Sequence, residues 1–117
     1  MRALILGLAL CAGAVQAQQT STASGAVLRA LDKTSGETVD ISVPAGQGAR
    51  LGRLQVVLNE CRYPAGNPSG DAYASLEVSQ TGQQGTVFSG WMIASAPALN
   101  AMEHPRYDIW VMRCTTS

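Results

Sequence analysis

The chain has 117 residues, 46% of them hydrophobic and 14% charged, and its 8 basic and 8 acidic residues balance. This length suits one domain. Nucleic acids and anionic membrane surfaces are both bound through clusters of Lys and Arg, so the even scatter of charge here disfavours both as partners.

Residues 1–17 have the layout of a secretory signal. Arg2 supplies a positive charge, an apolar run covers Ala3–Val15, and small residues precede a cut after Ala17. The apolar run is shorter than the ~20 residues that span a bilayer. Cys11 raises the alternative of a lipoprotein, but the leucine before it is not the small residue that lipid attachment normally follows. We expect a cleaved, periplasmic protein without membrane insertion.

The mature chain reads as one small all-β domain. Residues 18–25 are small and polar and predict a flexible N-terminus, and 26–117 alternate short β-type runs with Gly, Pro, Asn and Ser, as in a small antiparallel sandwich or barrel. Asp32–Gly36 is typical of a hairpin loop, with Gly36 in a left-handed position. The predicted strands cover 26–31, 38–43, 54–61, 72–79, 86–93 and 107–114.

Three segments carry further structural predictions. Tyr107–Cys114 is apolar on both faces, which indicates a central strand. Ser95–Glu103 predicts one short helix, capped by Ser95, with Leu99 and Met102 on its buried face. The two prolines and two glycines of Arg62–Asp71 predict an exposed loop.

Cys61 and Cys114 are the cysteines that remain after cleavage. An even count in an exported chain points to a structural disulfide. A redox pair or two thiolate metal ligands are the alternatives, but neither cysteine lies in a C-x-x-C motif, and His104 alone does not complete a zinc site.

His104 is the only histidine, so a small hydrolase would depend on it together with a serine and with Glu103 or Asp108. There is no G-x-S-x-G motif. We expect instead that His104 caps the end of the predicted helix, where the helix dipole favours a partly positive imidazole. The sequence predicts no enzyme.

Met92, Met102 and Met112, together with His104, raise a copper-handling hypothesis, because thioether and imidazole ligands suit Cu(I). The methionines lie on separate predicted elements and form no Met-x-x-Met motif. Scattered methionines are more often core filler, so no metal or cofactor is expected.

The aromatic residues divide into predicted core and predicted contact residues. Trp91 and Trp110 are expected to fill the core, whereas a sugar or peptide platform would expose them. Tyr63 and Tyr73 flank the exposed loop and are candidates for a contact patch. A second candidate region lies between the helix and the last strand, and its members are His104, Arg106, Tyr107 and Asp108.

The C-terminal third resembles a family of small exported bacterial envelope proteins known only as a domain of unknown function. The resemblance rests on Phe88–Met92, Ser95–Leu99, Glu103–Val111 and Cys114, and the earlier stretches from Leu31 to Val43 and from Gly52 to Tyr63 fit the same pattern. It implies an envelope location and a paired Cys61 and Cys114. It carries over no catalytic or ligand residues.

We therefore expect a non-enzymatic binding or accessory protein that docks on another envelope protein, because loops on rigid scaffolds commonly carry recognition. An accessory subunit or assembly factor of an inner-membrane complex is the alternative. A small hydrolase or a copper-handling protein is the weaker hypothesis.

Overall fold

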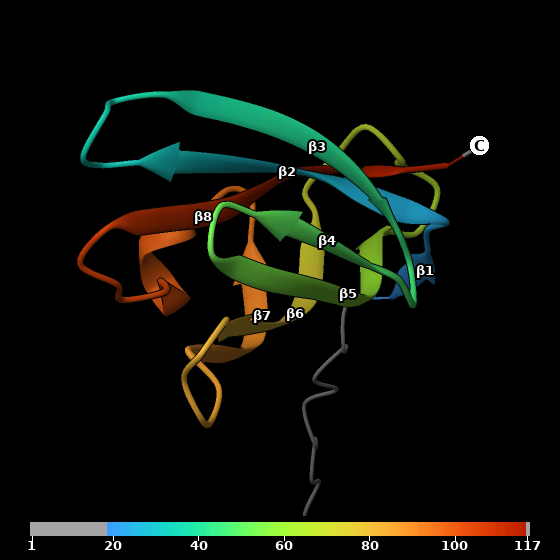
Figure 1. Cartoon of the computed structure of the whole chain (residues 1–117). Coiled ribbons are helices and arrows are strands. Elements are labelled where there is room, and N and C mark those ends of the chain that lie inside the picture. The colour runs from blue at the N-terminus through green and yellow to red at the C-terminus, as the bar shows by residue number, and fades with distance from the viewer. Residues whose placement is uncertain (1–18, 117) are drawn as a thin grey trace, which may run out of the picture.

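The computed structural model describes residues 19–116, which fold into two packed β-sheets (Figure 1). Residues 1–17, assigned above to a signal, lie outside the described residues. Among those described, no helix is long and apolar enough to cross a membrane. The elements are β1 (Thr20–Thr22), β2 (Gly25–Asp32), β3 (Thr38–Pro44), β4 (Gly48–Leu51), β5 (Leu54–Pro64), β6 (Tyr73–Gln80), β7 (Phe88–Ile93), the 3₁₀ helix η1 (Pro97–Asn100) and β8 (Tyr107–Thr115).

All strand pairs are antiparallel. The five-stranded sheet has the order β1-β5-β6-β7, and β4 pairs with the first half of β5 on the edge that β1 pairs at the other end. The three-stranded sheet has the order β3-β2-β8. The prediction of an all-β fold is confirmed, as an open sandwich and not a closed barrel.

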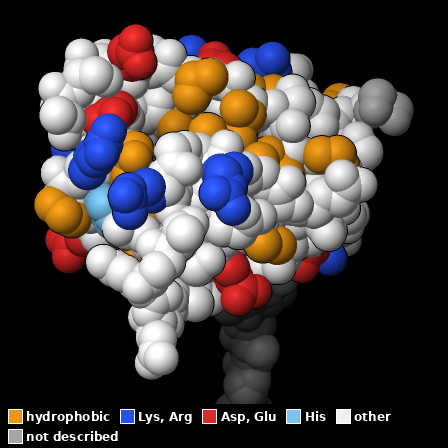
Figure 2. Space-filling model, in the orientation of Figure 1, with side chains coloured by type: hydrophobic (Ala, Val, Ile, Leu, Met, Phe, Trp, Pro, Cys, Tyr) orange, Lys and Arg blue, Asp and Glu red, His pale blue; other side chains and the backbone are white. Residues whose placement is uncertain are grey.

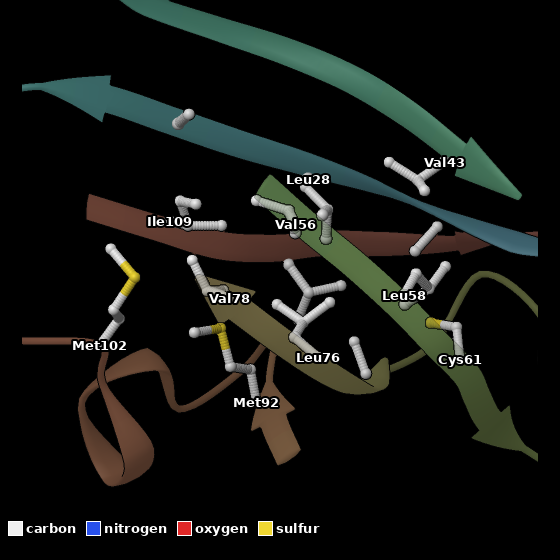
Figure 3. Packing of buried hydrophobic residues seen from close by; sticks show 14 of the residues in the cluster. Leu28, Val43, Val56, Leu58, Cys61, Leu76, Val78, Met92, Met102 and Ile109 are labelled. Carbon is white, nitrogen blue, oxygen red and sulfur yellow. The ribbon is translucent and has the colours of Figure 1, made fainter. Parts of the chain in front are cut away.

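The core lies between the two sheets and follows the predicted alternation. Leu54, Val56 and Leu58 on β5 are fully buried, and so are Leu76 and Val78 on β6. Figure 3 shows side chains of both sheets pointing into this shared layer. A side chain of this size contributes about 1.5–3 kcal/mol when it is removed from water, so these residues dominate the stability of the fold.

Two β-bulges decide where the cysteines point. In β5, Leu58 pairs with Leu76 and Glu60 with Ser75, which leaves Asn59 as an extra residue. In β8, Val111 and Arg113 face consecutive residues of β2, which leaves Met112 unpaired. Side chains of a regular strand alternate between its two faces, and one extra residue reverses that alternation. Without the bulges the two cysteines that follow would point away from the core.

Cys61 and Cys114 form the predicted disulfide, which joins β5 of one sheet to β8 of the other. Their Cα atoms are 5.8 Å apart, and 53 residues separate them in sequence. Cys61 is fully buried and Cys114 is 6% exposed. Such a bond persists in an oxidising compartment, so the chain is suited to an environment outside the reducing cytoplasm.

The predicted flexible segment over 18–25 is wrong for most of its length. Thr20–Thr22 pair with the end of β5. Ala23 is 6% exposed, and its N–H donates to the carbonyl oxygen of Cys61 at 2.8 Å. The reason is that β4 covers only the first half of β5, so the remaining edge binds the N-terminal residues.

The prediction of a central C-terminal strand is also wrong. In the part of the chain that the structure describes, β8 pairs with β2 alone and is an edge strand. Its outward residues Trp110 and Met112 are half-buried. Val27 of β2 points to the same outer face and is 6% exposed, although it lies outside the main core cluster. Within residues 19–116 no third layer packs on this outer face, so its apolar side chains are shielded by neighbours in the same sheet.

The predicted helix over 95–103 shrinks to the single 3₁₀ turn η1. Leu99, predicted to be buried, is 74% exposed, whereas Met102 is 4% exposed as predicted. The residue after η1, Ala101, has an extended backbone with φ −92° and ψ 145°. A turn of this length presents no continuous buried face, and Met102 lies beyond its end. The three-residue spacing therefore does not place Leu99 and Met102 on one face of a helix.

Ser95 does not cap η1, because its groups bind Asp71. The Asp71 carboxylate accepts the Ser95 N–H at 2.9 Å, the Ser95 hydroxyl at 2.6 Å and the Ala72 N–H at 2.9 Å. Partial burial raises the pKa of Asp71, but the hydrogen bonds from Ser95 and Ala72 outweigh it and hold that pKa below its ordinary value. This carboxylate ties the 65–72 loop to the segment that leads into η1.

Candidate docking groove

The predicted contact residues lie at opposite ends of the sandwich. Tyr73 pairs with Arg62 at one end of the β5–β6 ladder. His104 contacts Gln80, which belongs to the other end of the same ladder. Tyr63 is partly buried and packs against the core. The structure therefore does not join the two tyrosines to the region around His104.

His104 holds the turn that leads into β8. Its Nδ1 accepts the backbone N–H of Arg106 at 3.0 Å and that of Tyr107 at 3.1 Å. Its Nε2 lies 2.7 Å from Oε1 of Gln80. Because Nδ1 accepts, the ring hydrogen sits on Nε2 and is donated to Gln80. The expected role as a helix cap is wrong, since η1 ends before His104 and the imidazole caps the start of a strand.

Replacing His104 with alanine is expected to lower the free energy of unfolding by about 1–3 kcal/mol, because the buried N–H of Tyr107 loses its acceptor. Urea denaturation of the mature protein measures this loss. Glu103→Ala is the matched control, because Glu103 is an exposed neighbour and should change stability by less than about 0.5 kcal/mol. Equal stability of the two variants would show that the imidazole is not a structural group.

A groove of about 520 Å³ opens at this end of the sandwich. It lies between the β2–β3 hairpin, the turn from β4 to β5 and the start of β8. Tyr107 forms part of its floor and packs over Gly52, whose φ of +58° and missing side chain leave room for the ring. We call it the mouth groove, and it is lined by Ala30, Leu31, Asp32, Glu37, Thr38, Val39, Leu51, Gly52, Arg106 and Tyr107.

The mouth groove forms because β3 diverges from the opposite sheet. Val39, Ile41 and Val43 share the inward face of β3, as the sequence predicts. Val43 is 2% exposed, Ile41 is half-buried and Val39 is 49% exposed. The burial of one face thus falls steadily towards the β2–β3 hairpin, which lies on the same side of the molecule as the loop that leads into β8 (Figure 1). An inward-facing valine exposed in this way marks apolar surface that the fold itself leaves uncovered.

The rim of the mouth groove is charged and internally braced. Nη2 and Nε of Arg106 lie 3.1 and 3.3 Å from the two carboxylate oxygens of Asp32. The hydrogen bonds from Arg106 hold the pKa of Asp32 below its ordinary value, so this carboxylate stays ionised in mildly acidic solution. The same guanidinium lies 5.1 Å from the ring centroid of Tyr107. Lys33 Nζ donates to the carbonyl of His104 at 2.9 Å, and Figure 2 shows basic side chains gathered beside the histidine.

Of the four residues predicted as a contact region before the last strand, His104, Arg106 and Tyr107 lie at the mouth groove, and Asp108 does not. His104 and Arg106 support the rim, whereas Tyr107, at 7% exposure, is more floor than contact surface. Asp108 faces Leu31 in the β2–β8 ladder and borders a different, smaller groove beside η1. Val39, Leu51 and Glu37 were not predicted as site residues. The alternation of β3 places Val39 on the inward face, but its exposure depends on how far two sheets diverge.

The predicted burial of Trp91 in the core is wrong. This residue lies on the outer face of the five-stranded sheet, opposite Ser75, and is 41% exposed where core burial was expected. Tyr73, two residues from Ser75 on β6, shares that face and pairs with Ile93. Exposure is what a ligand platform requires of an aromatic ring, although the neighbours of Trp91 here are mainly short or charged.

The methionines considered as copper ligands do not share one site. Met92 and Met102 are 3% and 4% exposed and point into the core (Figure 3). Met112 lies half-buried on the outer face of β8. Among residues 19–116, no group of three or more His, Cys, Asp or Glu side chains is placed to hold a metal ion.

Comparison with known proteins gives a family and one distant relative. The model of a family described as "Uncharacterized protein conserved in bacteria (DUF2155)" matches residues 26–114. An uncharacterised protein of Rickettsia prowazekii (strain Madrid E) is 26% identical over 88 residues, which cover 73% of this chain and 57% of that protein. The chain thus spans little more than half the length of this relative. No solved structure matches the present chain.

Proposed function

The chain belongs to the DUF2155 family of proteins conserved in bacteria, and from that premise we propose that it is an exported, non-enzymatic binding module. It acts in the periplasm and docks on another envelope protein through the mouth groove. The observation that carries this proposal is Val39, an inward-facing residue of β3 that is 49% exposed beside a braced, charged rim.

Export is supported by two independent features. The first 17 residues have the pattern of a cleaved signal. The disulfide between Cys61 and Cys114 fits an oxidising compartment, because cytosolic thiols are kept reduced. A periplasmic location accounts for both, since a signal sequence delivers the chain to a place where the cysteines can pair.

A protein partner suits the mouth groove better than a small molecule. Small-molecule sites usually bury most of the ligand in a concave pocket, whereas this groove is half open and bordered by a strand edge. Its apolar floor is ringed by Asp32, Glu37 and Arg106, and an apolar centre with a polar rim is the usual anatomy of a protein interface.

Site-specific photo-crosslinking in the native cell tests this proposal. A photoreactive amino acid replaces Thr38, which lines the mouth groove. The matched control carries it at Ala65, an exposed residue just beyond β5 at the opposite end of the sandwich. We expect a crosslinked envelope protein from position 38 that excess unlabelled wild-type protein competes away. Equal crosslinking from both positions, or none from position 38, would refute docking through this groove.

A further inference from the structure

The edge strands of the described structure differ in how well they are covered. On β8, Ile109 and Val111 are each 1% exposed. On β7, the carbonyl of Trp91 accepts the side-chain N–H of Asn100 at 2.8 Å. On β3, by contrast, five of the seven residues are exposed. Within residues 19–116, β3 pairs with β2 alone. Of the described edge strands, β3 is therefore the one with the largest number of exposed residues.

The hydrogen bonds at both ends of β3 show which of its backbone groups face outward. Asp32 N–H donates to the carbonyl of Glu37, and Ala45 N–H donates to the carbonyl of Ser24, both at 2.9 Å. Backbone groups of an antiparallel strand alternate between its two edges. The odd-numbered residues of β3 therefore bond β2, and the even-numbered ones face away. The outward residues are Thr38, Asp40, Ser42 and Pro44.

This outer edge can pair with one more strand over a limited length. Thr38, Asp40 and Ser42 each present an N–H and a carbonyl oxygen, whereas Pro44 has no N–H and ends the available stretch. A strand added there would lie about 4.8 Å from β3. Its inward side chains would continue the row of Val39 and cover the apolar floor of the mouth groove.

The charges around the edge select the added strand. Asp40 is paired with Arg29 at 2.7 Å, and Asp32 is paired with Arg106 at 3.1 Å. The carboxylate of Glu37 has no ion-pair partner among the described residues, although it borders the groove. An added strand that carries Lys or Arg beside Glu37 would supply the missing ion-pair partner of this carboxylate.

A second copy of the chain is a poorer occupant than a different protein. Two antiparallel β3 strands centred on Ile41 or Ser42 would place Pro44, without an N–H, opposite Thr38 or Asp40. The register centred on Asp40 would place two aspartates directly opposite one another, which is destabilising. A proline and a charge on an edge strand are devices that block self-pairing of this kind.

We propose that β3 accepts an extended segment of a partner protein as an added strand, with alternate apolar side chains entering the mouth groove and a basic residue beside Glu37. This inference rests on the proposed docking function and names the form of the partner. Main-chain hydrogen bonds along Thr38–Ser42 supply affinity, and the groove supplies selection, as in other cases of strand addition.

The test compares Ser42→Pro with Ser42→Ala in the chain that carries the crosslinker at position 38. Both variants lose the hydroxyl, but only proline loses the outward N–H, and neither touches a β2–β3 hydrogen bond. We expect Ser42→Pro to reduce crosslinking about tenfold while Ser42→Ala keeps it within about twofold of the parent. Equal crosslinking in the two variants would overturn strand addition while leaving docking at the groove intact.

A second variant keeps the proposal testable if Ser42→Pro does not fold. Glu37→Lys reverses an exposed charge and leaves the carbonyl of residue 37 in place, and we expect it to reduce crosslinking at least about fivefold, whereas Arg50→Glu on β4 should not. Unchanged crosslinking in Glu37→Lys would refute the basic segment. A crosslinked product with the mass of two copies of this chain would refute a different protein as the occupant.

Discussion

Replacing Cys61 and Cys114 together with alanine is expected to lower the free energy of unfolding by about 4 kcal/mol. The bond closes a loop of 53 residues, and the chain-entropy relation gives about this value for a loop of that length. A domain of this size has only about 5–15 kcal/mol of stability in total. Urea denaturation of the oxidised wild type and the double variant at 25 °C measures the difference.

The control for this experiment is the wild type incubated with a reductant but without denaturant. Because Cys61 is fully buried and Cys114 is 6% exposed, we expect the bond to survive until the fold opens, so the folded sample should keep its oxidised mass. A difference of less than about 1 kcal/mol between the wild type and the double variant would contradict a stabilising role for the bond.

Inserting one alanine between Arg113 and Cys114 is expected to prevent the native disulfide. After the bulge at Met112, Arg113 and Cys114 pair with Val27 and Ala26 of β2, and Cys114 faces the core at 6% exposure. The added alanine would take this inward position and turn Cys114 to the outer face. The bond would then be lost together with the burial of Cys114, at a cost of at least about 4 kcal/mol. Alkylation of free thiols followed by mass spectrometry reports whether the two cysteines are paired.

The matched control for the insertion is Met112→Ala, which removes a half-buried side chain of β8 but keeps the number of residues in the strand. It should retain the disulfide and cost about 1 kcal/mol or less. If the insertion variant still contained the Cys61–Cys114 bond at wild-type stability, the alternation of side chains along β8 would not be what directs Cys114 into the core.

The sequence predicts the core of this fold well because regular alternation is visible without a structure. Leu54, Val56 and Leu58 recur at every second residue, and all three are fully buried. The same rule does not predict the facing of Cys61 or Cys114, because each follows a bulge that no local residue pattern announces. The pairing of the cysteines could be predicted from their number, but not the backbone irregularity that makes it feasible.

The candidate site could be predicted only in part for a related reason. The segment that contains His104 and Arg106 was predicted as a contact region, and both residues brace the rim of the mouth groove. The exposure of Val39 could not be predicted, because an alternating strand looks the same whether the opposite sheet stays close or diverges. The edge position of β8 was missed because its outward Trp110 resembles a buried residue in sequence.

The disulfide and the mouth groove lie at opposite ends of the same two sheets. Cys114, Ala26 and Val43 form one row across the three-stranded sheet, and Val43 is 2% exposed. Ile109, Ala30 and Val39 form a row nearer the hairpin, where Val39 is 49% exposed. The two sheets are thus joined covalently at one end, whereas at the other they are held by the contacts of His104 with Gln80 and of Tyr107 with Gly52, and the inward face of β3 is left uncovered. The covalent bond fixes the separation of β5 and β8 far from the uncovered part of β3, so a strand added beside β3 requires no change in the disulfide.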